Sequence, residues 1–245
     1  MRRVLAQLVK HLPAAHPPDM QGTMTTPAAG EPQPAPAKRQ RNRRGEGARL
    51  TELIEAAARH LEATGDAHAL TLAAVAREAG IAAPSIYRHF ANRDELVGAV
   101  VADRFQRLDT VLLEAMSSAP DPAAALRACC EAYCRFGLKH PGHYQVLFTA
   151  SLALDPARAG DRPGERVFGR LVAAVQACID AGIARPGDAR MMATNLWVAL
   201  HGIVSLRTSR PHHPWPTVQT LVNAALAGQT GLDLSNISIH RPQHE

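Results

Sequence analysis

The stretch that decides the fold is Thr71–Leu96, TLAAVAREAGIAAPSIYRHFANRDEL. Apolar residues in its first third recur at helical spacing, which predicts a short helix with one buried face. Gly80 follows this helix and suits the left-handed turn that ends one. A second short helix is expected over residues 83–90, with Ile86 and Phe90 on its inner side. Two short helices joined by a turn with a Gly form a helix-turn-helix, whose second helix enters the major groove of DNA.

The outer side of this second helix is where DNA bases would lie, and most of its side chains can form hydrogen bonds. The residues expected to face DNA there are Ala83, Pro84, Ser85, Tyr87, Arg88 and His89. Thr71 and Arg93 stand at predicted helix N-termini, where backbone N–H groups favour a phosphate. We therefore expect these two residues to position the protein on the DNA backbone.

The segment 49–96 resembles the N-terminal domain of the TetR family of transcriptional regulators. The motifs that carry the resemblance are Thr71, Ala79-Gly80-Ile81, Tyr87-Arg88-His89-Phe90 and Arg93. One departure is Ala82, because the family usually has Ser at the start of the recognition helix. A lost capping hydroxyl costs about 1 kcal/mol of helix stability. Pro84, in the first turn of that helix, compensates by pre-setting the backbone.

A second resemblance lies at residues 195–207, NLWVALHGIVSLR, which is similar to the WHG-type C-terminal domain of one branch of the same family. That branch implies a C-terminal domain that binds a small-molecule effector and forms a homodimer. Together the two resemblances imply a regulator released by its ligand from a double-stranded, pseudo-palindromic DNA operator. Whether it represses or activates, and which effector it binds, stay open.

Composition and patterning predict an all-α fold of about nine helices, and the resemblance implies that this fold is TetR-like. Aromatic residues are few, Ala and Leu are many, and no alternating run closed by turn signals indicates a sheet. A three-helix DNA-binding domain is then joined by one long helix to a helical ligand-binding and dimerisation domain. The expected divisions are a disordered extension at 1–47, the helix-turn-helix domain at 48–95, the C-terminal domain at 96–228 and a flexible tail at 229–245. The helices are expected near 47–64, 71–79, 83–90, 92–116, 122–139, 142–153, 164–181, 187–206 and 218–226.

The net charge of +5 comes from the N-terminal extension, because residues 48–245 hold equal numbers of basic and acidic residues. A basic arm directly before the first helix is expected to neutralise DNA phosphates. Its cationic residues are Lys38, Arg39, Arg41, Arg43 and Arg44. Two alternatives stay open for residues 1–12, namely a short amphipathic helix or a segment upstream of a start at Met20 or Met24.

Two sets of residues in the C-terminal half are candidate contacts for the effector and for a second subunit. The expected ligand pocket comprises Phe136, Tyr144, Phe148, Trp197 and His201. For Trp197 and His201, packing in the core is the alternative. The segment 191–206 is apolar on nearly every face, which predicts burial on both its own core and a partner subunit. The expected dimer contacts are Leu200, Val204, Val218, Leu221, Val222 and Ala225.

Other chemistries have little support in the sequence. Four Cys residues show no disulfide framework, which indicates a reducing cytoplasm. We find no catalytic motif, and we expect no metal or cofactor. The uncharged run 191–206 is too short and too polar to span a membrane. Two alternatives remain, a DNA-binding regulator without a ligand and a thiol-responsive sensor, and we expect the long helix at 92–116 to transmit any ligand signal.

Overall fold

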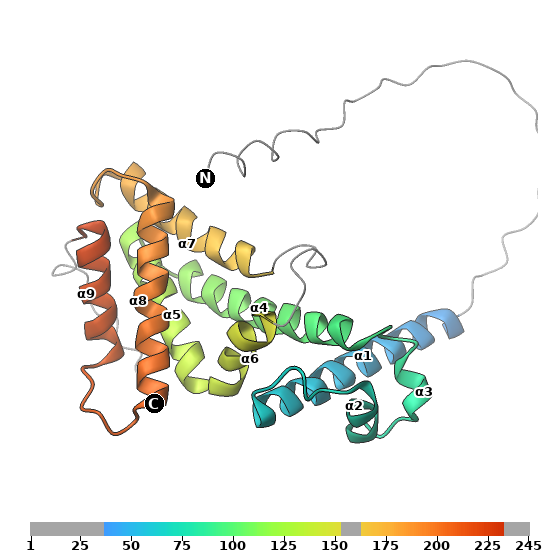
Figure 1. Ribbon diagram of the computed structural model, residues 1–245. Helices are drawn as coiled ribbons and strands as arrows, with labels where there is room; N and C mark the ends of the chain where they lie inside the picture. The colour runs from blue at the N-terminus through green and yellow to red at the C-terminus, as the bar shows by residue number, and fades with distance from the viewer. Residues whose placement is uncertain (1–36, 153–162, 233–245) are drawn as a thin grey trace, which may run out of the picture. The chain divides into compact units, whose positions relative to one another are not determined.

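The computed structural model describes residues 37–152 and 163–232, and over these ranges the chain forms helices joined by turns and loops (Figure 1). Within those ranges there are nine helices and no strand, so the all-α prediction is confirmed. The helices are α1 (Ala37–Thr64), α2 (Leu72–Glu78), α3 (Ala83–Ile86), α4 (Arg93–Ser117), α5 (Pro122–Lys139), α6 (Pro141–Leu152), α7 (Pro163–Asp180), α8 (Ala189–Ser209) and α9 (Val218–Thr230). The chain divides into the units Met1–Gln40 and Arg41–Glu245, and apart from the first residues of α1 everything below concerns the second unit.

The first helix begins ten residues earlier than the sequence predicts. The expected start at Gly47 and the expected disordered extension to that residue are wrong, because α1 begins at Ala37. The intervening run is rich in Arg, Lys, Gln and Glu, which are good helix formers, and it extends the helix in the N-terminal direction. The tail predicted for 229–245 begins too early, because α9 runs to Thr230 and Leu232 is buried in the C-terminal core. The disorder predicted for residues 1–36 and the rest of the tail, 233–245, lie outside the described residues.

The turn between α2 and α3 is a closed C-terminal cap. Gly80 has a φ of +67°, which an L side chain rarely adopts. The Ile81 amide donates to the Ala76 carbonyl at 2.9 Å, and the Gly80 amide donates to the Arg77 carbonyl at 3.2 Å. This pair of bonds is the Schellman arrangement, which satisfies the last carbonyls of α2 and fixes the direction in which the chain leaves it.

The recognition helix is shorter than predicted. Helix α3 spans four residues and passes into turns at 87–89, whereas a helix over 83–90 was expected. Ala82 makes no side-chain cap, as its methyl group requires, and Pro84 lies in the first turn. Ile86 and Phe90 are both buried, which confirms their placement on the inner side.

Two apolar cores stabilise the compact unit. The first lies among α1, α2, α3 and the N-terminal half of α4. The second is formed by the C-terminal half of α4 with α5, α7, α8 and α9. Because α4 contributes to both, it connects the helix-turn-helix domain with the C-terminal helices (Figure 1).

Helix α6 also joins the two cores, which corrects the expectation that α4 alone does so. Tyr144 and Leu147 of α6 are buried in the C-terminal core. Val146 and Ala150 of the same helix are buried in the DNA-binding core. The sequence could not show this, because α6 is apolar on several sides and its pattern does not reveal which neighbour each side meets.

None of the helices within 37–152 and 163–232 has the length and hydropathy that crossing a membrane requires.

Candidate functional site

The predicted DNA-contacting residues of the helix-turn-helix lie on one largely exposed surface. Tyr87 has 60% of its surface exposed, although it is aromatic. Ala83, Pro84 and Arg88 are exposed as well, whereas Ser85 and His89 are partly buried. An exposed tyrosine beside an exposed arginine offers a hydroxyl and a cation to a polar partner.

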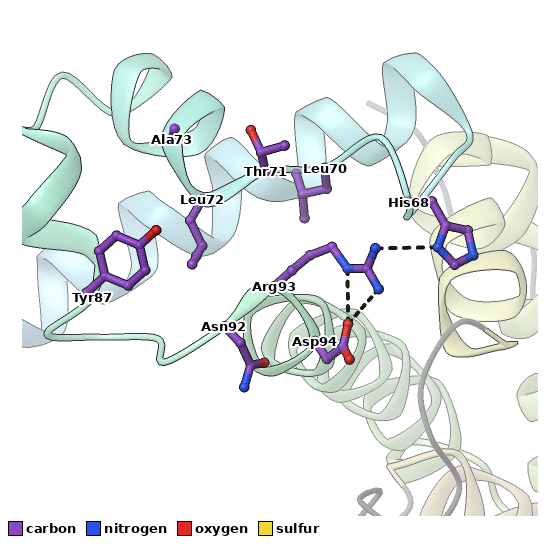
Figure 2. A pocket seen from close by; sticks show the side chains of 9 residues that line it. All are labelled: His68, Leu70, Thr71, Leu72, Ala73, Tyr87, Asn92, Arg93 and Asp94. Carbon is purple, nitrogen blue, oxygen red and sulfur yellow. Dashed lines mark hydrogen bonds and ion pairs between the residues drawn. The ribbon is translucent and has the colours of Figure 1, made fainter.

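Beside this surface lies an open pocket of about 530 Å³ between the start of α2 and the start of α4 (Figure 2). It brings together three predicted DNA-binding residues, Thr71, Tyr87 and Arg93. Its full lining is His68, Leu70, Thr71, Leu72, Ala73, Tyr87, Asn92, Arg93 and Asp94. His68 and Asp94 were missed at the sequence level, because a loop His and an acidic residue carry no signal of their own for DNA contact.

Side-chain caps fix the two helix starts that border the pocket. The Thr71 hydroxyl accepts a hydrogen bond from the Ala74 amide at 3.2 Å, so this residue is the N-cap of α2. The Asn92 side chain caps α4 by accepting from the Glu95 amide at 2.9 Å. In return, the Glu95 carboxylate accepts from the Ala91 amide at 2.6 Å. These caps hold the surroundings of Arg93 in a defined geometry.

The guanidinium of Arg93 is held by two neighbours across this pocket. Its Nε and one Nη donate to the same oxygen of Asp94, at 3.0 and 2.8 Å. Its other Nη lies 3.4 Å from Nδ1 of His68 (Figure 2). Arg93 is therefore fixed at the border of the recognition surface by side chains from α4 and from the loop that precedes α2.

The basic run at 38–44 lies within the first part of α1, and its backbone is helical. The side chains of Lys38, Arg39, Arg41, Arg43 and Arg44 lie outside the described side chains. Their DNA contacts therefore stay a prediction. The backbone that carries these residues is helical and not the disordered arm that was expected.

In the C-terminal domain, four of the five predicted pocket residues form one aromatic cluster. The Phe148 and His201 rings are 4.6 Å apart, and the Tyr144 and Phe148 rings are 4.9 Å apart. Trp197 lies 6.3 Å from Phe148 and has 40% of its surface exposed. The fifth residue, Phe136, contacts the rings of His140 and His143 instead.

A chain of hydrogen bonds runs through this cluster. The Trp197 indole N–H donates to the Tyr133 hydroxyl at 3.3 Å, and the hydroxyls of Tyr133 and Tyr144 are 3.0 Å apart. The Tyr144 hydroxyl lies 2.6 Å from Nδ1 of His201. Burial lowers the pKa of His201 and raises that of Tyr144, so both groups are neutral near pH 7 and share one hydrogen bond, whose donor depends on the imidazole tautomer. Burial also raises the pKa of Tyr133 to about 12.

Two members of this cluster were missed at the sequence level. Tyr133 supplies the central hydroxyl, and Phe168 of α7 lies 6.0 Å from the Trp197 ring. The single hydroxyl of Tyr133 on the otherwise apolar inner side of α5 was an available signal. Phe168 carried none, because Phe on an amphipathic helix is usually core.

The expected dimer contacts need correction. Leu200, Val204 and Val222 are buried in the core of the chain itself, so they have no surface for a partner. Val218 and Ala225 are partly buried against the same core, and Leu221 is partly buried. The pattern alone could not separate the side of α8 that faces its own core from the outer side.

The outer side of α8 carries apolar side chains that the subunit itself does not cover. Met191, Val198 and Leu206 are exposed there, Val198 with 63% of its surface. A Cβ added at Gly202 would meet no atom within 4 Å. The prediction that α8 has apolar surface outside its own core therefore stays, but the residues on that surface differ from those expected.

A cluster of charged residues lies where α1, α4 and α6 meet. The Arg104 side chain of α4 is only 1% exposed, and its Nη2 lies 2.9 Å from Glu55 and 3.8 Å from Glu62, both of α1. Nε2 of His143 on α6 lies 3.2 Å from Glu62. A Cβ on Gly142 would come within 2.7 Å of Glu62, so only glycine allows α6 to approach α1 this closely.

Burial perturbs the titration of two members of this cluster. It raises the pKa of Glu62, against the opposing effect of Arg104. Burial, together with the neighbouring Arg104, lowers the pKa of His143 to about 4. His143 is therefore neutral near pH 7, and this junction contains one buried cation facing carboxylates of α1.

The four cysteines are all buried in the C-terminal core. Burial raises the pKa of Cys129 and Cys134 to about 12 and that of Cys178 to about 11, and it raises the pKa of Cys130. Because the thiolate is the reactive form, these thiols are poorly suited to sensing. Over residues 37–152 and 163–232 no group of three or more His, Cys, Asp or Glu could hold a metal ion.

Comparison with known families gives two matches on this chain. Residues 53–100 match the family described as "Bacterial regulatory proteins, tetR family". Residues 126–228 match "Tetracyclin repressor-like, C-terminal domain", and this second range includes the WHG-type run on α8. The first matched range contains most of the core formed by α1 to α4, and the second contains most of the C-terminal core. Both resemblances stated from the sequence are confirmed.

Individual proteins agree with the family matches. The chain is 28% identical over 158 residues to the HTH-type transcriptional activator FasR of Mycolicibacterium smegmatis, covering 64% of this chain and 67% of FasR. A TetR family transcription regulator from Marinobacter aquaeolei VT8 shares the fold with a TM-score of 0.63 at 17% identity, over 77% of this chain and 98% of that one. AibR, solved in complex with isovaleryl coenzyme A and operator DNA, has a TM-score of 0.59 at 16% identity, over 74% and 97%.

Proposed function

Since this chain belongs to the TetR family of DNA-binding transcriptional regulators, we propose that it is a cytoplasmic repressor that binds a pseudo-palindromic operator as a homodimer and is released by a small-molecule ligand. The observation that carries the ligand response is the double role of α6. This helix places Tyr144 and Phe148 in the aromatic cluster and buries Val146 and Ala150 in the DNA-binding core.

The DNA contact is proposed for the surface formed by α3 and the adjoining pocket. Tyr87 and Arg93 would bind backbone phosphates, with Thr71 beside them at the capped start of α2. Base recognition would fall to Ser85, Arg88 and the small exposed side chains of the first turn of α3. Contacts with thymine methyl groups and sensitivity to groove shape complete the recognition.

The ligand is proposed to bind at the aromatic cluster and to compete with the hydrogen bonds between Tyr144 and His201. A ligand group that replaces these bonds would shift α6, because Tyr144 belongs to that helix. Val146 and Ala150 would then move against α1 and α4. A ligand can release DNA in this way only if it binds the DNA-incompetent arrangement more tightly, typically by about 1–3 kcal/mol.

The homodimer is proposed to form through the outer side of α8. Met191, Val198 and Leu206 present apolar surface there, and Gly202 leaves room for close approach of another helix. A second copy of the chain is the economical partner, because a two-fold axis would place two recognition helices on two half-sites. The neighbouring helix α9 would contribute Leu221, which its own core covers only partly.

Four variants test the division between the DNA and ligand sites. Trp197→Ala and His201→Ala should weaken the ligand response and keep the operator affinity of the ligand-free protein. Tyr87→Phe and Arg93→Ala should lose DNA affinity and keep ligand binding. Fluorescence anisotropy measures the affinity for operator DNA, and thermal shift measures ligand binding. Acyl-coenzyme A thioesters are suitable first ligands, since AibR was solved with isovaleryl coenzyme A.

The outcome would contradict the proposal if the two α8 variants changed operator affinity as strongly as they changed ligand binding. Unfolding of both α8 variants would show that the cluster is packing. Activation is the second candidate function, because the relative FasR is an activator. A reporter gene behind the bound promoter separates the two, since deletion of a repressor raises expression and deletion of an activator lowers it.

A further inference from the structure

Asp94 is placed where an acidic residue opposes DNA binding. It lines the pocket beside the recognition surface and binds Arg93 through two hydrogen bonds to one carboxylate oxygen. A guanidinium has five N–H donors, and Asp94 takes two of those on Arg93, while His68 lies within reach of a third. A phosphate approaching Arg93 therefore meets a cation that already forms an ion pair with its neighbour.

Capping does not explain why an acid stands at this position. The start of α4 is capped by Asn92, and Glu95 binds the backbone amide of Ala91. Asp94 directs its carboxylate to the Arg93 side chain instead (Figure 2). Its contribution to the helix dipole is shared with Glu95 in the same turn. The contact that explains the position of Asp94 is therefore its ion pair with Arg93.

We propose that Asp94 is an affinity-limiting residue, which pairs with Arg93 in the DNA-free protein and must give up that pair when a phosphate binds. The inference rests on the phosphate contact proposed above for Arg93. The helix-turn-helix segment 48–95 holds five basic and seven acidic residues, so each available cation has a large share in the binding. Limiting one of them lowers the affinity for DNA of any sequence.

The test uses the full-length protein and a fluorescein-labelled 30-base-pair duplex of random sequence, so no operator is needed. Asp94→Asn should tighten binding by about two- to five-fold at low salt, the range expected when an exposed ion pair no longer competes. The slope of log K against log salt should steepen by up to about 0.9, the value for one phosphate contact. Arg93→Ala should weaken binding, and Arg93→Ala combined with Asp94→Asn should bind as Arg93→Ala alone.

Glu78→Gln is the matched control. It removes one negative charge from the same domain, and the Glu78 side chain, which pairs with Arg59 away from the pocket, is about as exposed as that of Asp94. Its affinity should stay within two-fold of the parent protein. Thermal unfolding of each variant shows whether the fold is kept.

The results separate the two proposals. If Arg93→Ala leaves the affinity unchanged, the phosphate contact itself is wrong. If Arg93→Ala weakens binding while Asp94→Asn also weakens it or leaves it unchanged, then Asp94 orients Arg93 and does not limit it. A gain from Asp94→Asn that persists without Arg93, or an equal gain from Glu78→Gln, would show a general charge effect and overturn the inference.

Discussion

Arg104 and Arg107 allow a matched measurement of the junction between α1, α4 and α6. Both lie on α4 and both bind Glu55 and Asp103. The Arg104 side chain is 1% exposed and that of Arg107 is 43% exposed. Replacing each with Met keeps much of the side-chain volume and removes the charge, so the difference between the two variants reports the effect of burial.

The expected magnitudes differ clearly. Removing one partner of a buried ion pair costs about 3–5 kcal/mol. The carboxylates that Arg104 leaves behind retain 30% and 26% exposure at Glu55 and Glu62, and they can be partly hydrated. We therefore expect Arg104→Met to lower the free energy of unfolding by about 2–3 kcal/mol. Arg107→Met should cost about 0–1 kcal/mol, as is usual for exposed pairs.

Urea denaturation followed by circular dichroism measures both values, at equal protein concentration because a dimer links stability to concentration. The cost of Arg104→Met should also grow from pH 5 to pH 8. Without Arg104 the pKa of Glu62 rises further, so the buried carboxyl is neutral at low pH and becomes a costly charge as pH increases. Equal costs for the two variants, or a cost below 1 kcal/mol for Arg104→Met, would refute the view that this junction depends on a buried cation.

Three further predictions concern the interface, the titration of the junction and the thiols. Val198→Arg should yield folded monomers in sedimentation velocity, whereas Leu221→Arg should have a smaller effect; a folded dimer with unchanged affinity would exclude the outer side of α8 as the interface. His143 has its pKa lowered from 6.5 to about 4, so its contribution to stability is complete above pH 6.5 and is lost as pH falls toward 4. As pH falls from 6.5 to 4, the free energy of unfolding of His143→Gln should therefore rise relative to that of the parent chain. The exposed control His212→Gln should show no such relative change. The native thiols should react with Ellman's reagent only on unfolding. Fast reaction at pH 7.5 that also changes DNA affinity would instead support the thiol-responsive sensor.

The sequence was informative where a local pattern has one structural solution. Gly80 at the end of an apolar stripe predicted the helix-turn-helix, because few residues tolerate its positive φ. The motif ending in Phe90 and the WHG-type run identified the family before any coordinates. Trp197 and His201 were predicted to line one pocket, and both rings do contact Phe148 in one cluster.

The parts that could not be predicted depend on contacts between helices distant in sequence. The burial of Arg104 requires Glu55 and Glu62 of α1 and cannot be read from α4 alone. The same holds for Leu200, whose apolar side chain suits a core and an interface equally. The shortness of α3 also had no local signal, because residues 87–90 are compatible with a helix.

The most direct measurement is selection of genomic DNA fragments by the purified full-length protein, with Arg93→Ala selected in parallel. The parent protein should enrich fragments that share an inverted repeat, with half-site centres about 10–10.5 base pairs, or a multiple of that, apart. It should bind them as two chains per site, and Arg93→Ala should lose the enrichment. Fragments without a common motif, or equal enrichment by both proteins, would contradict DNA recognition through the surface at α3 and the start of α4.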